Sequence, residues 1–221
     1  MSEHQGDSRL IIFSDFDGTV TRQDVGNRLF HHFSDGKSEG PVALWRADKI
    51  DSRQCLLDEA TLMRPVTQEE LYQFIDSFAV DPGFEPFVRL CRSHGVPLYI
   101  LSDGLELYIK RLLSIHNLSS LSFFTNHADL IDGHLQISFP FGGQGCGRCG
   151  NCKGYHIQRL RKAGQTVVYI GDGKSDLCAV PHADLIFAKD FLAAHCRENS
   201  IDFEPYDDFT AIAEYLKNNW L

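Results

Sequence analysis

Four short apolar runs recur along the chain, and each is too short to form a helix. Each is typical of a strand that is buried on both faces, as in a parallel sheet. The runs span residues 10–13, 96–101, 167–170 and 185–188. The sequence therefore predicts parallel β-strands at these positions.

Amphipathic segments between these runs carry apolar residues at helical spacing. The stripes comprise Phe84, Phe87, Val88 and Cys91, then Leu105, Ile109, Leu112 and Leu113, and then Ile157 and Leu160. The first stripe leads to Gly95 and the last to Gly164, and we expect each glycine to cap its helix. Strands that alternate with helices indicate an α/β fold, with a Rossmann-like parallel sheet covered by helices on both faces.

Residues 22–82 contain no strand-like run and carry helical patterns instead. The apolar stripes comprise Val25, Leu29, Phe30 and Phe33, then Cys55, Leu56, Ala60 and Met63, and then Leu71, Phe74, Ile75 and Phe78. Thr67 and Glu70 have the spacing of a capping box at the start of the third helix. We therefore predict an α/β core of residues 1–21 and 83–221, with a small all-helical cap of residues 22–82 inserted after the first strand. Such a cap can cover whatever binds at the carboxyl end of that strand.

An irregular segment spans residues 123–153. Asp132-Gly133 lies between apolar residues and predicts a tight hairpin turn. The glycines that follow are interleaved with cysteines, and a loop tolerates this density of glycine best. These residues are Gly142, Gly143, Gly145, Cys146, Gly147, Cys149, Gly150 and Cys152.

Polar segments follow three of the predicted strands at the point where each strand ends. They are Asp15-Phe16-Asp17-Gly18-Thr19, Ser102-Asp103-Gly104 and Gly171-Asp172-Gly173-Lys174-Ser175-Asp176. Ligands of open α/β sheets bind outside the carboxyl ends of the strands, so we expect these three loops to line one crevice.

The crevice would bring the carboxylates of Asp15, Asp17 and Asp172 close together. Like charges at such distances need a counter-charge, and Mg²⁺ suits oxygen ligands that leave room for water and phosphate. Glycines in the three loops would let backbone N–H groups approach an anion closely. Ser102 offers a hydroxyl, and Lys153 offers a positive charge.

Composition narrows the set of partners. The formal net charge is −9, with 21 Lys and Arg against 30 Asp and Glu. This balance argues against nucleic acid or an anionic membrane, because both reward clustered positive charge. The chain has no apolar run near the roughly 20 residues that span a bilayer, and residues 1–9 lack the apolar core of a signal peptide. We therefore expect a cytoplasmic protein that acts on a small molecule, and a second copy of the chain remains a candidate partner.

The ordered motifs resemble those of the haloacid dehalogenase superfamily of phosphatases. The matching residues are Asp15 to Thr19, Ser102, Lys153 and Asp172 to Asp176, and the helical insert resembles the small cap of the phosphoserine phosphatase branch. Further segments resemble the methionine-salvage phosphatases, which act on 2-hydroxy-3-keto-5-methylthiopentenyl-1-phosphate. These segments are Asn126-His127-Ala128, the hairpin, the cysteine-rich loop, Phe187 to Asp190 and Pro205 to Phe209.

The resemblance implies a role for each motif residue. Asp15 would attack phosphorus to form an aspartyl-phosphate, and Asp17 would protonate the leaving alcohol and then activate water. Mg²⁺ would be held by Asp15, the backbone carbonyl of Asp17, and Asp172. Asp176 would hold a metal-bound water or orient Lys153. The phosphate-binding set would comprise Ser102, Asp103, Gly104 and Lys153.

Several alternatives stay open at this point. A phosphatase of phosphoserine or of another small metabolite would carry the same motifs, and a phosphomutase or phosphotransferase would use the same nucleophile. A non-enzymatic metal-binding module would treat the aspartate loops as incidental. Cys146, Cys149 and Cys152 are either a group of structural or redox thiols, or part of a zinc or iron–sulfur site, for which Cys178 or His156 would have to supply the fourth ligand.

Overall fold

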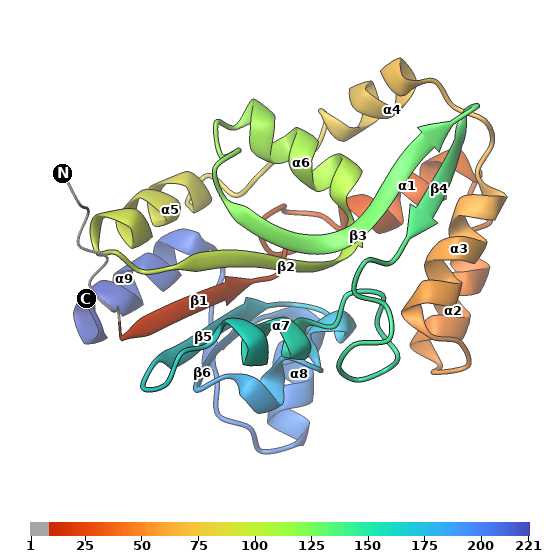
Figure 1. The fold of residues 1–221 in the computed structure, drawn as a ribbon. Helices are drawn as coiled ribbons and strands as arrows, with labels where there is room; N and C mark the ends of the chain where they lie inside the picture. The colour runs from red at the N-terminus through yellow and green to blue at the C-terminus, as the bar shows by residue number, and fades with distance from the viewer. Residues whose placement is uncertain (1–8) are drawn as a thin grey trace.

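A seven-stranded, mostly parallel sheet forms the centre of the computed structural model, which describes residues 9–221 (Figure 1). The strand order is β4-β3-β2-β1-β5-β6-β7. The strands are β1 (Leu10–Ser14), β2 (Leu98–Leu105), β3 (Ser122–Ile131), β4 (His134–Ser138), β5 (Thr166–Gly171), β6 (Leu185–Ala188) and β7 (Glu204–Pro205). The expected α/β fold with a Rossmann-like parallel sheet is confirmed.

Strand β1 lies in the middle of the sheet, between β2 and β5. Ser14, its last residue, aligns with Ile100 of β2 and with Ile170 of β5, and both pairings are parallel. The chain order reverses on either side of β1, so this strand marks the topological switch point at which α/β sheets bind ligands.

Helices cover both faces of the sheet, and each face has its own apolar core. One face packs against α5 (Phe84–Ser93), α6 (Glu106–Ile115) and α9 (Phe209–Asn219). The opposite face packs against α7 (Lys153–Leu160) and α8 (Asp190–Glu198). The apolar stripe predicted for α5 is the buried face of that helix. The stripes predicted for α6 and α7 match in part, because Leu105 belongs to β2 and Leu160 is only partly buried.

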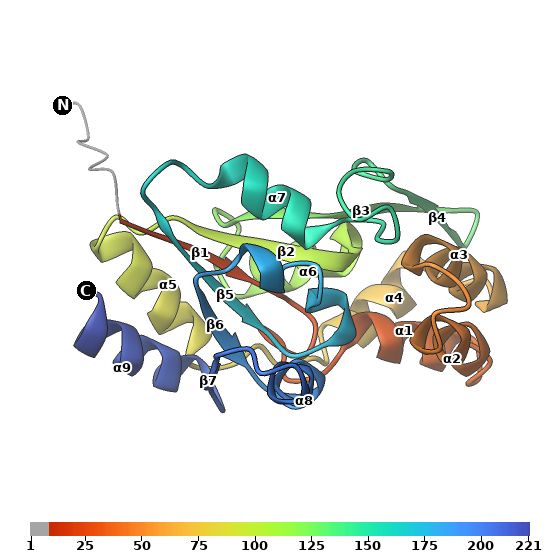
Figure 2. The same ribbon diagram turned by 90° about the horizontal axis from the view of Figure 1, so that it is seen from below.

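Four helices stand between β1 and α5, at the carboxyl end of the central strands (Figure 2). They are α1 (Val25–Phe33), α2 (Glu39–Arg46), α3 (Ser52–Leu62) and α4 (Gln68–Ile75). The capping box expected for the third predicted helix is present at the start of α4, where Thr67 and Glu70 bond each other's backbone N–H groups. Helix α2 was not predicted, because its one buried residue, Val42, does not form an apolar stripe.

The hairpin expected at Asp132-Gly133 joins β3 to β4, and both turn residues have positive φ. Its turn reaches the helical segment, because Val66 N–H donates to the carbonyl of Gly133 at 2.9 Å. The sequence did not predict that the first half of β3 also pairs with β2 in the parallel sheet, where Tyr99 aligns with Ser122.

One of the two predicted helix caps is wrong. Gly95 does end α5, with φ of 63°, and its neighbour Val96 bonds back to Cys91. Helix α7, however, ends at Leu160 with Arg161 as its C-cap, so Gly164 lies beyond it in the turn that leads to β5. Within residues 9–221, no helix is long and apolar enough to span a membrane. Residues 1–8, where the sequence lacks a signal-peptide pattern, lie outside the described residues.

Candidate active site

Three segments meet at or near the carboxyl ends of β1, β2 and β5. The loop after β1 carries Asp15 and Asp17, the last part of β2 carries Ser102, and the loop after β5 carries Asp172 and Asp176. All except Asp176 line one pocket of about 510 Å³. The expected loop of Ser102-Asp103-Gly104 is wrong in one respect, because β2 continues through these residues to Leu105. The local fold follows from the sequence, because each apolar run ends at the residue where the polar side chains begin.

Lys153, the first residue of α7, reaches the centre of the site. Its Nζ lies 2.6 Å from Asp15 Oδ1 and 2.5 Å from Asp176 Oδ1, and it donates to Ser175 Oγ at 3.0 Å. The side chain is fully buried. Burial lowers the pKa of Lys153, but the charges and hydrogen bonds of Asp15 and Asp176 outweigh it and raise the pKa above its ordinary value. Lys153 is therefore a fixed positive charge beside Asp15.

Asp176 is held from every side by the protein. Its Oδ2 accepts the backbone N–H groups of Asp172 and Gly173 at 2.9 and 2.8 Å, and its Oδ1 also accepts the hydroxyl of Tyr169. With both oxygens engaged, Asp176 is arranged to orient Lys153, which is one of the two roles that the resemblance implied.

Three carboxylates crowd together at this point. Oxygens of Asp15, Asp172 and Asp176 lie within 4.8 Å of one another. Burial and the charges of Asp176 and Asp172 raise the pKa of Asp15 well above its ordinary value, although Lys153 opposes them. Burial and Asp176 likewise raise the pKa of Asp172 to about 7. If all three were ionised, Lys153 would leave an excess of negative charge, and a hard divalent cation is the counter-charge that this oxygen set suits.

The backbone is shaped to let Asp172 approach the loop after β1. Gly18 has φ of 76°, and a Cβ there would lie 2.4 Å from Asp172 Oδ2. Thr19, the next residue, donates its hydroxyl to Asp172 Oδ1 at 2.7 Å. A residue other than glycine would therefore both strain the backbone and displace this carboxylate.

Asp17 lies apart from this carboxylate group. Its Oδ1 accepts the N–H groups of Val25 and Gly26 at the start of α1, at 2.9 and 3.2 Å, and its Oδ2 accepts the Tyr108 hydroxyl at 2.6 Å. Burial and the charge of Asp24 raise the pKa of Asp17 to about 7. The side chain is thus held as a carboxyl that can lose or gain a proton near neutral pH. It does not belong to the group of Asp15, Asp172 and Asp176 that could hold a metal ion.

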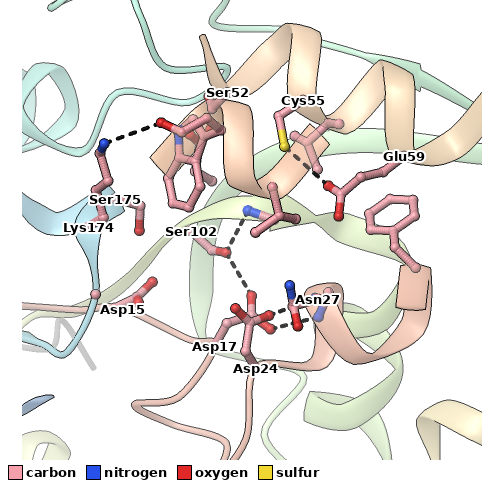
Figure 3. Close-up of a pocket in the computed structure, with 18 of the residues that line it drawn as sticks. Asp15, Asp17, Asp24, Asn27, Ser52, Cys55, Glu59, Ser102, Lys174 and Ser175 are labelled. Carbon is pink, nitrogen blue, oxygen red and sulfur yellow. Dashed lines mark hydrogen bonds between the residues drawn. The ribbon is translucent and has the colours of Figure 1, made fainter. Parts of the chain in front are cut away.

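The last part of β2 contains residues that face the pocket and residues that support a neighbouring loop. Ser102 Oγ accepts the N–H of Gly104 at 2.9 Å and donates to Asp17 Oδ2 at 3.4 Å (Figure 3). Helix α6 begins later, after Leu105, so Ser102 is not its cap. The carboxylate of Asp103 accepts the N–H of Asn151 at 2.7 Å, which indicates a role in holding the cysteine-rich loop. A carboxylate would repel phosphate, so only the backbone of Asp103 suits the phosphate-binding set.

The helical segment forms the opposite wall of the pocket. Figure 3 shows Ser52, Cys55 and Glu59, all on α3, across from Asp15 and Asp17. The remaining wall mixes apolar side chains with charged ones, and these include Phe30, Val42, Trp45, Leu56, Asp24 and Arg46. The pocket is thus suited to a small molecule with an apolar part.

Glu59 is the most unusual group in this wall. Its side chain is 4% exposed, Cys55 Sγ lies 3.6 Å from its Oε2, and its Oε1 has no hydrogen-bond partner. Burial and the charge of Asp24 raise the pKa of Glu59 to about 8. At neutral pH it is therefore mostly a neutral carboxyl that can donate or accept a hydrogen bond inside the pocket.

Sequence reading missed Glu59, Asp24 and Tyr108 as site residues. Glu59 follows Cys55 by four positions, so its place on the buried face of α3 was a detectable signal. The role of Tyr108 was not detectable, because it depends on how α6 approaches Asp17. Lys174 lies in the third loop, and its Nζ donates to the carbonyls of Trp45 and Arg46 at 3.2 and 2.8 Å. It thereby joins the core to α2.

Comparisons with known proteins agree with this geometry. Residues 12–180 match the haloacid dehalogenase-like hydrolase family. The chain is 31% identical over 216 residues to the 2-hydroxy-3-keto-5-methylthiopentenyl-1-phosphate phosphatase of Bacillus velezensis. The aligned region covers 94% of this chain and 90% of that protein. It is 29% identical over 209 residues to the phosphatase of the same name from Bacillus pumilus, covering 90% and 87% of the two chains.

Solved structures show the same fold. A phospho-aspartyl intermediate analogue of phosphoserine phosphatase superposes with a TM-score of 0.74 at 18% identity, covering 95% of this chain and 99% of that one. Phosphoserine phosphatase from T. onnurineus superposes with a TM-score of 0.72 at 18% identity, covering 99% and 98%. The family match over most of the chain, the sequence relatives and the shared fold lead to one conclusion. The chain belongs to the haloacid dehalogenase-like hydrolases, and within that family it is a phosphatase.

Proposed function

We propose that this phosphatase is a Mg²⁺-dependent phosphomonoesterase that acts on 2-hydroxy-3-keto-5-methylthiopentenyl-1-phosphate through an aspartyl-phosphate. The observation that carries the proposal is the contact of 2.6 Å between Lys153 Nζ and Oδ1 of Asp15, which lines the pocket. In this account residues 22–82 are the cap, and residues 1–21 and 83–221 are the core. A cytoplasmic location and a homodimer stay predictions.

Asp15 is the proposed nucleophile, and its surroundings fit that role. One carboxylate oxygen attacks phosphorus, the P–O bond to the substrate alcohol breaks, and the phosphoryl group passes to Asp15. Lys153 offsets negative charge on the phosphoryl oxygens, and Ser102 can donate its hydroxyl to them. Asp15, Asp172 and the backbone of Asp17 would hold Mg²⁺, which would neutralise phosphoryl charge when bound.

Asp17 is the proposed acid and base. Its carboxyl proton passes to the leaving oxygen, and its carboxylate then takes a proton from the water that attacks the aspartyl-phosphate. A pKa of about 7 suits a group that must do both near neutral pH. Tyr108 and the N–H groups of α1 keep the side chain in place between the two steps.

Two features of the pocket wall support the methionine-salvage substrate. Phe30, Val42 and Leu56 offer an apolar surface for its methylthio end. Glu59, mostly neutral, can donate a hydrogen bond to its keto or hydroxyl oxygen. Both relatives named above carry the same substrate in their names.

Phosphoserine is the second candidate substrate. Asp24 and Arg46 both line the pocket, and their charges could pair with the ammonium and carboxylate of serine. A neutral Glu59 lacks the negative charge that would attract an ammonium group, so we rank phosphoserine below the enol-phosphate.

A comparison of kcat/KM over a panel of phosphorylated metabolites tests the proposal. We expect the salvage enol-phosphate to exceed phosphoserine by at least about 100-fold, because an apolar tail in a fitted pocket discriminates on that scale. The Asp15→Asn protein, purified in the same way, serves as the control for contaminating phosphatase activity. A higher value for phosphoserine would overturn the substrate, and transfer of phosphate to an added alcohol in place of water would indicate a phosphotransferase.

A matched pair of leucines on α3 sharpens this test. Leu56 lines the pocket, whereas its neighbour Leu57 is 40% exposed. Leu56→Ser should raise KM for the salvage substrate about 10-fold and leave phosphoserine hydrolysis unchanged. Leu57→Ser should change neither value. Equal effects of Leu56→Ser on both substrates would contradict an apolar tail site at this position.

A further inference from the structure

Four cysteines from two separate loops meet beside the active site. Three come from the glycine-rich loop before α7, and the fourth comes from the turn after β5. This cysteine cluster comprises the close group of Cys146, Cys149 and Cys152, together with Cys178, which contacts Cys149. None of the four is in a disulfide. The fold therefore supplies the fourth thiol that the spacing of the loop cysteines alone does not provide.

Three of the sulfur atoms are grouped closely enough to be ligands of one ion, and the fourth lies beside one of them. Sγ atoms of Cys146, Cys149 and Cys152 lie within 4.8 Å of one another, with 3.3 Å between the first two. Cys178 Sγ lies 4.0 Å from Cys149 Sγ. Four thiolates that surround one Zn²⁺ tetrahedrally at 2.3 Å are about 3.8 Å apart. A cluster of several iron atoms would hold its thiolates farther apart.

The backbone of the loop is folded tightly around one of these sulfurs. Cys146 N–H donates to Cys152 Sγ at 3.4 Å. Gly145 has φ of 71°, and a Cβ there would lie 2.5 Å from the same sulfur. Amide donation to sulfur and a glycine turn both suit a thiolate that carries charge, as a metal-bound cysteine does.

We propose that the cysteine cluster binds one structural Zn²⁺ ion through four thiolates. The four thiols release their protons when the ion binds. Because four thiolates complete the tetrahedral coordination of Zn²⁺, the site is closed and leaves no position for substrate. The inference stands on the position of the four sulfurs and does not depend on the proposed substrate.

The location of the cluster gives the ion a positioning role. Cys152 directly precedes Lys153, and Cys178 follows Asp176 by two residues. An ion that joins Cys152 to Cys178 would fix both ends of the contact between Lys153 and Asp176, where Nζ and Oδ1 are 2.5 Å apart.

The same loop also contacts the helical segment. Ser52 N–H donates to the carbonyl of Arg148 at 3.1 Å, Gly150 N–H donates to Ser52 Oγ at 3.0 Å, and Arg53 donates to the carbonyl of Gly147. A rigid loop would therefore hold α3, with Cys55 and Glu59, at a set distance from Asp15.

Metal analysis of the full chain, purified without chelator after growth with added zinc, tests the proposal. We expect about one zinc per chain, in the wild-type protein and equally in the Asp15→Asn protein, which separates this result from any outcome for turnover. Cys149→Ser and Cys178→Ser should each lower zinc at least 5-fold. Cys91→Ser is the control, because Cys91 is a free cysteine on α5, outside the cluster, and this variant should keep its zinc.

Cobalt substitution of the wild-type chain keeps the proposal testable if a serine variant does not fold. Co²⁺ bound by four thiolates gives intense sulfur-to-metal charge-transfer bands and the strong visible bands of a tetrahedral ion, and added Zn²⁺ should remove them. Absence of zinc after anaerobic reconstitution, or iron with inorganic sulfide in its place, would overturn the proposal.

Discussion

Lys153 and Asp15 form a buried ion pair between residues that are far apart in the chain. Nζ lies 2.6 Å from Oδ1, and the two side chains are 0% and 6% exposed. A buried lysine normally loses its proton, but here Asp176 supplies a second partner, so the positive charge is retained. The pair sets the charge of the site before any ligand arrives.

Lys153→Met should destabilise the chain through the carboxylates that it leaves behind. Removal of one partner from a buried ionic group costs about 3 kcal/mol, because the remaining charges lose their compensation. The loss in free energy of unfolding should be larger at pH 8 than at pH 5.5, because burial raises the pKa of Asp15 and a lower pH favours its neutral form. Urea unfolding without Mg²⁺ at the two pH values measures this difference.

Lys110→Met is the control for that experiment. Lys110 is 72% exposed and pairs only at 3.7 Å with Glu106, so its replacement should change stability by less than about 0.5 kcal/mol at either pH. A loss for Lys153→Met as small as this would contradict the buried ion pair.

Mg²⁺ should stabilise the protein through Asp172. The ion relieves repulsion between Asp172 and Asp15, so at 100 times its dissociation constant it should add about 2.7 kcal/mol of stability and raise Tm by roughly 5–10 °C. Asp172→Asn should lose most of that shift, whereas Asp129→Asn, on an exposed hairpin position, should keep it. Activity should vanish with chelator and return with Mg²⁺. Equal Tm shifts in the two variants would rule out Asp172 as a ligand.

Glu59 should make stability fall as pH rises. Its pKa is about 8 in the folded chain and near 4.5 when unfolded, so between these values the folded state binds the extra proton. The stabilising effect of that proton is complete below pH 4.5 and is lost progressively up to pH 8, with a slope of up to about 1.4 kcal/mol per pH unit.

Glu59→Gln should remove this part of the pH dependence. Measured by urea unfolding, the variant should gain stability relative to wild type as pH rises from 6 to 8. Other groups with raised pKa values, such as Asp17 and Asp172, contribute to both proteins and cancel in the comparison. A difference that is flat with pH, or that has the opposite sign, would contradict a neutral buried Glu59.

The sequence predicted the core of the fold because apolar runs and polar endings report burial directly. Residues 185–188 coincide with β6, and the run at 10–13 extends by one residue in β1. Helices α2, α8 and α9 and the two-residue strand β7 were not predicted. Helix α2 and strand β7 contain too few buried residues to form a pattern, whereas α8 and α9 do carry buried apolar residues.

Site residues could be predicted where they directly follow a predicted strand. Contacts between elements that are distant in the chain could not be predicted. Asp15 and Asp172 follow strand ends, so their convergence could be inferred. The contact of Tyr108 with Asp17 and that of Cys178 with Cys149 depend on how helices and loops pack, which spacing along the chain does not encode. The resemblance named Lys153, but its burial and its two carboxylate partners come from the structure.

Chemical trapping of the phosphorylated enzyme tests the central claim most directly. Turnover with Mg²⁺ and the salvage enol-phosphate is stopped with borohydride, which reduces an aspartyl-phosphate to an alcohol, and peptides are then analysed by mass spectrometry. The account predicts homoserine at position 15 only when substrate and Mg²⁺ are both present, and none in the Asp15→Asn protein. Phosphate release without modification of Asp15, or modification of another residue in its place, would contradict the account.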